Sequence, residues 1–142
     1  MIKDALIELI YTNDIMNKID ISIIVLTYNC ERVIKKNIKG ILNQNLFHLK
    51  YEVIIIDDAS TDNTYNELLT ISKNNNTIKL FHNNTNKGNG FCKNFAIEKT
   101  NGRYLYFIDD HVTLIDNKTL YRMYKKWYKC YTNRVTSYRW NK

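Results

Sequence analysis

Acidic side chains, one set joined by a histidine, directly follow short apolar segments at two places in the sequence. "YEVIIIDD" ends in Asp57 and Asp58, and "RYLYFIDDH" ends in Asp109, Asp110 and His111. Clustered carboxylates repel one another unless a cation or hydrogen-bond donors compensate their charge. A carboxylate oxygen together with an imidazole nitrogen suits Mn²⁺ or a related first-row metal better than Ca²⁺. These segments are therefore candidates for a site that holds a metal ion and a negatively charged ligand.

The second segment has the spacing of a metal site. Asp109 and His111 are two residues apart, so in an extended chain their side chains project to the same side and can meet one ion. The alternative is that Asp109 and Asp110 form a turn or cap the next helix, with His111 merely exposed. Residue spacing leaves both interpretations open.

The first segment also has two interpretations. A carboxylate at the end of a strand, such as Asp57 or Asp58, can accept hydrogen bonds from a nucleobase or a ribose hydroxyl. It can equally cap the following helix, although Ser60 and Asp62 are available for that role.

The elements that must position these side chains alternate along the chain. Short runs of β-branched and aromatic residues closed by polar ones predict buried strands, and apolar residues at helical spacing lie between them. This alternation predicts βαβ units with right-handed crossovers and an α/β fold with a parallel sheet. The predicted strands are 21–27, 51–57, 77–83 and 103–109, and the predicted helices are 30–44, 61–73, 89–100 and 117–131.

Ligands of open α/β sheets bind beyond the carboxyl ends of the strands. Both acidic segments lie there, and so does "TYN" after the first strand. The loop "NKGNG" leads into a helix that carries Lys93, and a helix N-terminus with a nearby lysine can neutralise phosphate. A solvated loop is the alternative for that stretch. His48 and His82 fall outside the strand ends that we select, and we treat them as unrelated to the site.

The organisation and composition of the chain limit which class of protein it can belong to. Residues 1–19 have the pattern of an amphipathic helix, and residues 20–142 are predicted to form one domain. The net charge is +7, but the 21 Lys and Arg residues are scattered, so we expect no nucleic-acid partner. The three cysteines lack a CxxC spacing, which indicates a reducing compartment rather than a zinc site or disulfides. We therefore expect a cytoplasmic protein, with peripheral attachment to a membrane left open.

Four motifs, taken in order, resemble those of family 2 glycosyltransferases. They are "ISIIVLTYNCERVIKKNIKGILNQ", "YEVIIIDDASTDNT", "NKGNGFCKNFAI" and "NGRYLYFIDDH". The resemblance implies a Rossmann-like GT-A fold, that of nucleotide-diphospho-sugar transferases, with a mostly parallel sheet and helices on both faces. It also implies metal-dependent, inverting transfer of a sugar from a nucleotide sugar, which we expect to be a UDP-sugar.

The family pattern implies roles for the matching nucleotide-binding residues. Thr27, Tyr28 and Asn29 would lie beside the nucleoside. Asp58, with Asp57 next to it, would contact the base or the ribose. Lys93 stands where the family commonly places an arginine near the nucleotide.

The last motif falls on the family's DxD motif, which binds the metal and, through it, the diphosphate. Here Asp109 and His111 would hold Mn²⁺ (or Mg²⁺), and Asp109 and Asp110 would both belong to the nucleotide-binding set. This DxH form is similar to that of polypeptide N-acetylgalactosaminyltransferases, in which the histidine also binds manganese.

One departure from the family concerns the acceptor half. Members usually carry the general base in a C-terminal half, whereas this chain ends about 30 residues after His111. Asp116 is the only acidic residue beyond the motif and is a weak candidate for the base. We expect a domain that apparently lacks the acceptor half, which a partner chain or a second copy would supply. A nucleotide-sugar-binding module without turnover is the alternative, and the acceptor, whether glycan, lipid or protein, is open.

Overall fold

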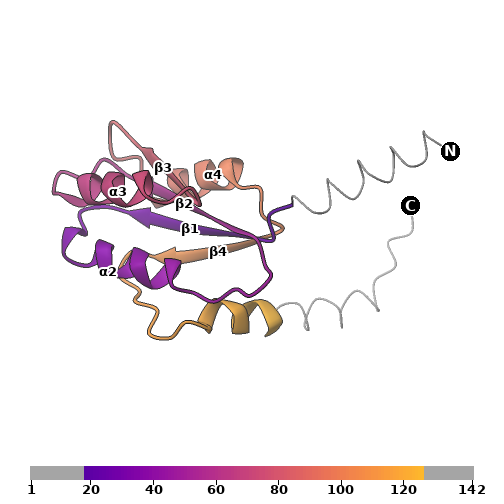
Figure 1. Ribbon diagram of the computed structural model, residues 1–142. Coiled ribbons are helices and arrows are strands. Elements are labelled where there is room, and N and C mark those ends of the chain that lie inside the picture. Colours follow the sequence, from indigo (N-terminus) through magenta and orange to yellow (C-terminus); the bar gives the residue numbers. More distant parts are fainter. Residues whose placement is uncertain (1–17, 127–142) are drawn as a thin grey trace, which may run out of the picture.

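A sheet of four parallel strands forms the centre of the protein (Figure 1). The computed structural model describes residues 18–126 of the 142-residue chain. The strands are β1 (Ile21–Thr27), β2 (Tyr51–Asp57), β3 (Ile78–His82) and β4 (Tyr104–Asp109), in the spatial order β3-β2-β1-β4. The connecting helices are α2 (Glu31–Leu42), α3 (Thr64–Lys73) and α4 (Asn89–Lys99). The predicted parallel α/β fold is confirmed.

The predicted bounds differ from the observed ones mainly at the helix ends. Strands β3 and β4 are shorter than predicted by one or two residues, and α2 ends at Leu42 rather than at residue 44. Helix α3 begins after Asn63, because the side chain of Asp62 accepts hydrogen bonds from the amides of Glu31 and Thr64 in the loop before the helix. The last predicted helix is present over residues 119–126, after a turn at residues 117–118. Residues 127–131 of it lie outside the described residues, as do residues 1–17 of the predicted N-terminal helix.

Each face of the sheet carries its own apolar layer, because alternate side chains of a strand point to opposite faces. Helices α2 and α3 and the helix of residues 119–126 cover one face, and α4 covers the other. Figure 1 shows α2 and the helix of residues 119–126 on the same side of β1 and β4. The first layer includes Ile23, Val25, Ile34, Ile38, Val53, Ile55, Leu68 and Leu120, and the second Ile24, Ile54, Ile56, Cys92 and Ala96.

The strand order reverses between β1 and β4. From β1 the chain proceeds through β2 to β3 on one side, and β4 then returns to pair with the free side of β1. A crevice opens beyond the carboxyl ends of the strands at such a reversal, because the flanking connections leave in opposite directions. The topology therefore places the ligand site beside the ends of β1 and β4.

The amino end of the sheet is held by a buried polar network. The carboxylate of Glu52, which is 4% exposed, accepts hydrogen bonds from Ser22 Oγ at 2.7 Å and Lys79 Nζ at 2.8 Å. Asn101 also donates to it, and the amide of Gly102 donates to Ser22 Oγ at 2.8 Å. Burial raises the pKa of Glu52, but the hydrogen bonds outweigh it, so the pKa lies below its ordinary value. This network joins β1, β2, β3 and the segment that leads into β4.

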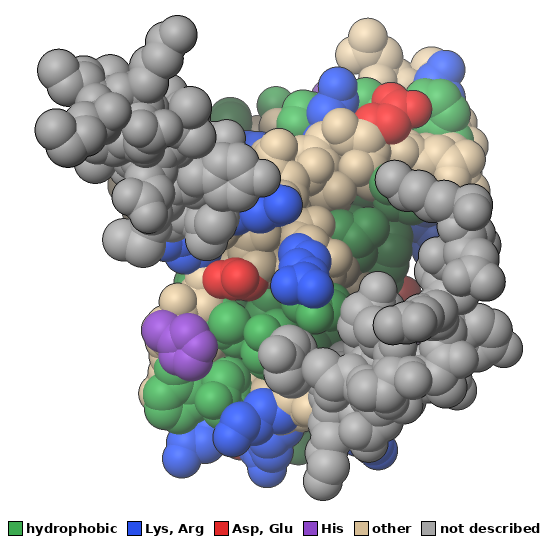
Figure 2. All heavy atoms as spheres, turned by 90° about the vertical axis from the view of Figure 1, so that its right-hand side faces the viewer, with side chains coloured by type: hydrophobic (Ala, Val, Ile, Leu, Met, Phe, Trp, Pro, Cys, Tyr) green, Lys and Arg blue, Asp and Glu red, His purple; other side chains and the backbone are tan. Residues whose placement is uncertain are grey.

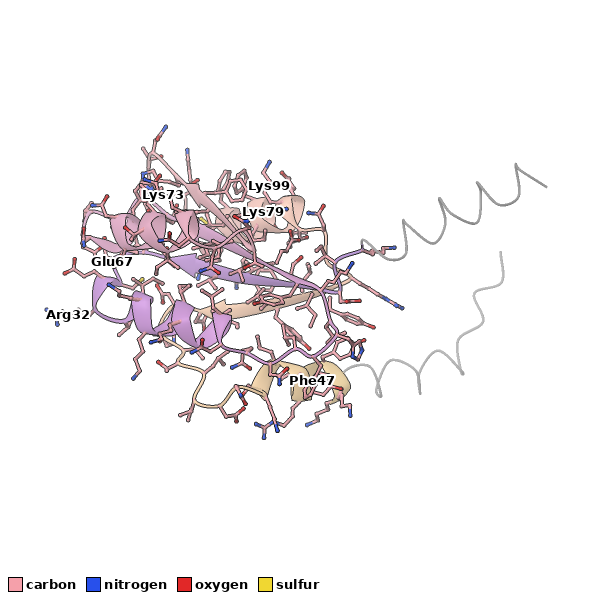
Figure 3. The ribbon with its side chains drawn as sticks, in the orientation of Figure 1. Arg32, Phe47, Glu67, Lys73, Lys79 and Lys99 are labelled. Carbon is pink, nitrogen blue, oxygen red and sulfur yellow. The ribbon has the colours of Figure 1, made fainter. Side chains whose placement is uncertain are left out.

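Figure 2 looks onto this amino end and shows basic, acidic and apolar side chains mixed on one face. Phe47, in the connection between α2 and β2, has its ring 4.4 Å from that of Tyr121 and lies beside the helix of residues 119–126 (Figure 3). Within residues 18–126, every helix is too short or too polar to cross a lipid bilayer.

Gly102 is a position where a side chain cannot be accommodated. A Cβ atom there would lie 2.5 Å from Ser22 Oγ and closer still to the Ser22 amide nitrogen. We expect Gly102→Ala to lower the free energy of unfolding by about 1–3 kcal/mol, the usual cost of overpacking. Urea denaturation checks this, with Gly90→Ala as the matched control, because a Cβ at Gly90 meets nothing within 4 Å. Equal losses in the two variants would contradict the packing argument.

Candidate functional site

A cavity of about 460 Å³ lies at the reversal of strand order. The ends of β1, β2 and β4 and the first turn of α4 contribute its walls. Its lining residues are Leu26, Thr27, Tyr28, Asp58, Asn86, Asn89, Cys92, Asp109, Asp110 and His111. Segments that are more than 80 residues apart in sequence thus meet at one place. Six of the residues predicted from the sequence line this cavity, namely Thr27, Tyr28, Asp58, Asp109, Asp110 and His111.

A second cavity, of about 610 Å³, lies at the amino end around Glu52, Lys79 and Asn101. It is larger, but its carboxylate is already paired with Lys79 and bonded to Ser22 and Asn101. The cavity at the carboxyl ends combines three carboxylates with an imidazole and is the better candidate for binding a charged ligand.

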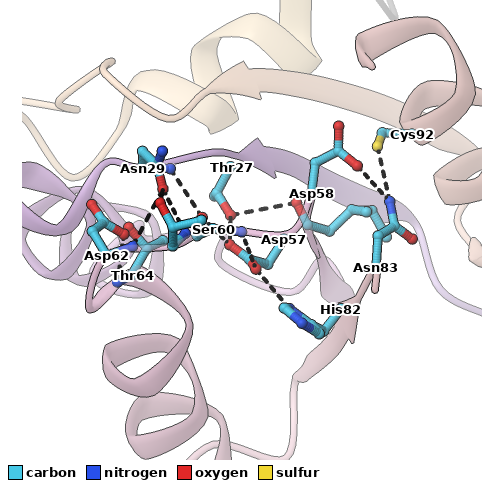
Figure 4. Close-up of polar contacts among 12 residues, drawn as sticks. Thr27, Asn29, Asp57, Asp58, Ser60, Asp62, Thr64, His82, Asn83 and Cys92 are labelled. Atoms are coloured by element: carbon cyan, nitrogen blue, oxygen red, sulfur yellow. Dashed lines mark hydrogen bonds and ion pairs between the residues drawn. The ribbon is translucent and has the colours of Figure 1, made fainter. Parts of the chain in front are cut away.

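Asp58 is buried at the cavity wall and fixed by the loop before α4 (Figure 4). Its Oδ1 accepts hydrogen bonds from Asn83 Nδ2 at 2.7 Å and from the Lys87 amide at 2.8 Å, and its Oδ2 accepts one from the Gly88 amide at 2.8 Å. Burial raises the pKa of Asp58, but these bonds outweigh it, so the pKa is lowered and the group is ionised at neutral pH. Because a carboxylate oxygen can accept two hydrogen bonds, Oδ2 retains capacity for a donor in the cavity.

Asp57 has a different environment from its neighbour. Its side chain is fully buried and accepts hydrogen bonds from Thr27 Oγ1 at 3.2 Å, from Ser60 Oγ at 2.5 Å and from the Ser60 amide at 3.2 Å. The Nδ1 atom of His82 lies 2.7 Å from it. Asp57 does not line the cavity, so its carboxylate supports the cavity wall from behind.

The loop after β1 is tied to the loop after β2. Asn29 has a positive φ of 49°, its amide donates to Ser60 Oγ at 2.9 Å, and its Oδ1 accepts from the Thr61 amide at 2.8 Å. These bonds hold Thr27 and Tyr28 at the cavity, whereas the side chain of Asn29 itself connects the two loops. The sequence predicted that Asn29 lies beside the nucleoside. In the structure Asn29 is not among the residues that line the cavity, and it bonds the loop after β2.

The segment after β4 is held by two amide side chains, one on α2 and one just beyond its end. Asn37, buried on α2, donates to the Asp110 carbonyl and accepts from Thr113 Oγ1 at 2.6 Å. Gln44, which follows the end of α2, donates to the Asp116 carbonyl at 2.6 Å. Neither residue was predicted as part of the site. Both are polar residues on the apolar face of a predicted helix, which is the sequence signal that could have identified them.

The side chains of this segment project into the cavity. Asp110 Oδ2 accepts from the Tyr28 amide at 3.4 Å, and its Oδ1 lies 3.5 Å from His111 Nδ1. The His111 side chain is 75% exposed, and Asp109 is also exposed. Acids from two strand ends and an imidazole therefore share one open cavity, with backbone amides and Lys87 nearby.

Comparison with known proteins assigns the chain to a family. Residues 22–139 match the family model described as glycosyl transferase family 2. The chain belongs to glycosyl transferase family 2. It is 35% identical over 103 residues to an uncharacterised glycosyltransferase of Haemophilus influenzae, which covers 72% of this chain and 40% of that protein.

Two further relatives bear on the chemistry of family 2. The chain is 35% identical over 98 residues to the Escherichia coli protein named UDP-Glc:alpha-D-GlcNAc-diphosphoundecaprenol beta-1,3-glucosyltransferase WfgD, covering 69% of this chain and 37% of the relative. The crystal structure of Staphylococcus aureus TarS 1-349 in complex with UDP-GlcNAc superimposes with a TM-score of 0.66 at 29% identity, covering 75% of this chain and 30% of TarS. The predicted GT-A-like fold is confirmed, and the chain spans less than half the length of these relatives.

The donor set of this family 2 chain fits a divalent metal in part. Within residues 18–126, no three His, Cys, Asp or Glu side chains are arranged to hold an ion by themselves. Asp109 and His111 would offer such an ion one oxygen and one nitrogen from exposed side chains in the same cavity, a combination that suits Mn²⁺. Ligand oxygens would have to complete the coordination shell, as is usual for metals that bind substrate phosphates.

Two other predicted residues lie outside the cavity wall. Lys93 is exposed on α4 and is not among the lining residues. Asp116 accepts hydrogen bonds from the Lys118 amide at 2.8 Å and from Thr119 Oγ1 at 3.1 Å, and it pairs with Arg122. These bonds lower the pKa of Asp116 and hold its carboxylate in the turn before the helix of residues 119–126, which suits a general base poorly.

Of the two described cysteines, Cys92 lines the cavity and Cys30 does not, and neither suits a nucleophilic role. Burial, with the charge of Asp110 adding to it, raises the pKa of Cys30 to about 12. Burial also raises the pKa of Cys92 to about 11, with Asp58 nearby. A thiol with such a pKa carries almost no thiolate at neutral pH, which argues against a nucleophilic role.

The sequence prediction for His82 was wrong. Strand β3 ends at His82, opposite Asp57 in the register of the sheet, and the next residue, Asn83, bonds Asp58. Two successive residues of one strand end thus hold two successive carboxylates of the neighbouring one (Figure 4). The rule that selected the ends of β1, β2 and β4 applied equally to β3 and would have found both.

Proposed function

We propose that this chain is the donor-binding domain of a metal-dependent glycosyltransferase that transfers a sugar from a UDP-sugar. One observation carries the proposal: Asp58 and the Asp109–His111 segment, 51 residues apart, line the same cavity at the reversal of strand order. Membership of family 2 and the UDP-GlcNAc complex of the similar TarS structure support it. This chemistry identifies the sugar donor and the acceptor only by their chemical class.

Asp58 binds the nucleoside in this proposal. Its Oδ2 atom has one internal donor and can accept a second hydrogen bond from an imide N–H or a ribose hydroxyl. Thr27 and Tyr28 line the same cavity, and the half-exposed side chain of Tyr28 offers an apolar surface to the base. Asp57 supports the cavity wall, and Lys93 is proposed to approach the nucleotide from α4.

Asp109 and His111 hold the metal and, through it, the diphosphate. A bound Mn²⁺ (or Mg²⁺) supplies Lewis-acid stabilisation of the charge that develops on the leaving nucleoside diphosphate. Asp110 orients the segment by accepting from the Tyr28 amide and lies beside the His111 ring. The amides of Lys87 and Gly88 hold the Asp58 carboxylate in place at the wall of the same cavity.

Inverting transfer requires a general base for the acceptor hydroxyl, and the described residues offer no good candidate. Asp116, the weak candidate, is already hydrogen-bonded to Lys118 and Thr119. We propose that a partner chain, a second copy or further sequence supplies the base and the acceptor site. The acceptor belongs to the glycans, lipids or proteins, and a membrane-linked acceptor would agree with the diphosphoundecaprenol in the name of the Escherichia coli relative.

A binding module without turnover is the second candidate function. It is favoured by the observation that Asp116, the candidate base, is already bonded to Lys118, Thr119 and Arg122. Both functions require nucleotide binding, and only the first requires cleavage of the sugar–phosphate bond.

Calorimetric titration with UDP, UDP-glucose and UDP-GlcNAc, with and without Mn²⁺, tests the proposal. We expect UDP to bind, Mn²⁺ to strengthen binding, and GDP to bind more weakly because a purine presents a different edge to Asp58. Failure of all three uridine ligands to bind would contradict the proposal. Release of UDP from a bound UDP-sugar distinguishes transfer or hydrolysis from binding alone.

A further inference from the structure

We propose that His82 is a positioning residue of the nucleotide site, which it shapes through Asp57 without touching the ligand. The inference rests on the proposed function, because it concerns the same cavity. His82 ends β3 and is absent from the cavity wall, so any effect on the ligand must pass through its neighbours.

The contact between His82 and Asp57 has the features of a fixed, charge-assisted hydrogen bond. The Nδ1 atom lies 2.7 Å from Asp57 Oδ2, and the Asp57 side chain is 0% exposed. A buried carboxylate accepts hydrogen bonds, so Nδ1 carries the proton in this pair. The ring of His82 is further held against Tyr65, with the two ring centres 4.3 Å apart. The ring contact packs the imidazole, whereas the hydrogen bond determines which ring nitrogen faces Asp57.

Asp57 connects His82 to the loops around the cavity through further hydrogen bonds. Its Oδ1 accepts from Thr27 Oγ1 at 3.2 Å, and Thr27 lines the cavity. The same oxygen accepts from Ser60 Oγ at 2.5 Å, and Ser60 Oγ accepts from the Asn29 amide at 2.9 Å. One buried carboxylate therefore fixes both the end of β1 and the connection between the loops that follow β1 and β2.

These loops need such support because their backbone is strained. Asn29 has φ of 49° and Ala59 has φ of 63°, and non-glycine residues rarely adopt this left-handed region. Strained residues keep their conformation only where surrounding contacts determine it. Ala59 lies between Asp58 and Ser60, so loss of order there displaces the nucleoside-binding carboxylate as well.

Only the Nδ1 atom of His82 faces Asp57, so variants that carry an N–H at the position of Nδ1 or of Nε2 give a direct test. Asparagine places an N–H close to the position of Nδ1, whereas glutamine extends it toward the position of Nε2, and phenylalanine keeps the ring but has no donor. UDP affinity of the full chain is measured by calorimetry for His82→Asn, His82→Gln and His82→Phe, far below each variant's unfolding midpoint. Tyr65→Leu is the matched control, because it removes the ring contact and leaves the hydrogen bond.

We expect His82→Gln and His82→Phe to bind UDP about tenfold more weakly than wild type, the scale of a hydrogen bond to a charged group. His82→Asn should recover affinity to within about threefold, and Tyr65→Leu should bind like wild type. A merely structural role would change the unfolding midpoint without this order of affinities. If His82→Phe does not fold, the comparison of the asparagine and glutamine variants decides.

Equal UDP affinity in all variants, or an asparagine variant as weak as the glutamine one, overturns the positioning role. Either result leaves the proposed function standing, because wild type still binds UDP. Failure of wild type to bind UDP overturns the proposed function and this inference together.

Discussion

Asp58→Asn is expected to weaken UDP binding by about 10- to 100-fold, in the presence and in the absence of Mn²⁺. The substitution keeps the size of the side chain but removes its charge and one acceptor oxygen. Asp58 is held by Asn83 and by the amides of Lys87 and Gly88, and its lowered pKa keeps it ionised throughout the neutral range. The lost interaction is a charge-assisted hydrogen bond to the nucleoside, so a metal on the diphosphate cannot replace it. Calorimetric titration with UDP measures the effect.

Asp62→Asn is the matched control for this substitution. Asp62 lies four residues further on in the same loop, also has a lowered pKa, and accepts hydrogen bonds from Glu31 and Thr64 amides, but it does not line the cavity. We expect it to change stability without changing UDP affinity. Wild-type affinity in the Asp58 variant, or an equal loss in both variants, would refute a direct contact between Asp58 and the nucleoside.

His111→Ala is expected to remove most of the gain in UDP affinity that Mn²⁺ provides, a loss of at least about tenfold. Even substitution of residues that only hydrogen-bond a metal ligand lowers metal affinity by about 10–100-fold. The metal-free affinity should stay near that of wild type, because Asp58 and the β1 loop are untouched. The fold should also be unaffected, because the His111 side chain is 75% exposed. Titrations with and without Mn²⁺, together with urea denaturation, measure the three quantities.

His48→Ala provides the control for removal of an exposed histidine, because His48 lies before β2 and away from the cavity wall. It should leave the Mn²⁺-dependent gain intact. If the gain persists in the His111 variant, the metal is held by other groups, with Asp109 and Asp110 the first to test.

Several features could be predicted because they depend on local sequence. The near-continuous apolar run of β2 is typical of a parallel strand covered on both faces, and the spacing of Ile34 and Ile38 gave the buried face of α2. The parallel order then placed Asp58 and the segment of residues 109–111 at the same edge. Their meeting in one cavity followed from topology alone.

The different roles of Asp57 and Asp58 could not be predicted in this way. Adjacent residues at the end of a strand point to opposite sides, and which side is buried depends on what packs there. Asp57 faces His82 and Ser60, whereas Asp58 faces Asn83 and the loop before α4. The partners of each carboxylate come from other strands and loops, and only the register of β2 with β3 brings them into contact.

The sequence by itself determined the fold class, the family and the set of acidic strand ends, because hydrophobic periodicity and strand-end position are properties of short segments. Tertiary structure decided which of those side chains face the cavity, which of them support its wall, and that Asp116 is bonded within the turn before the last described helix. The physical reason is that burial and hydrogen-bond partners are set by segments distant along the chain. The pattern of one segment cannot specify the geometry of another.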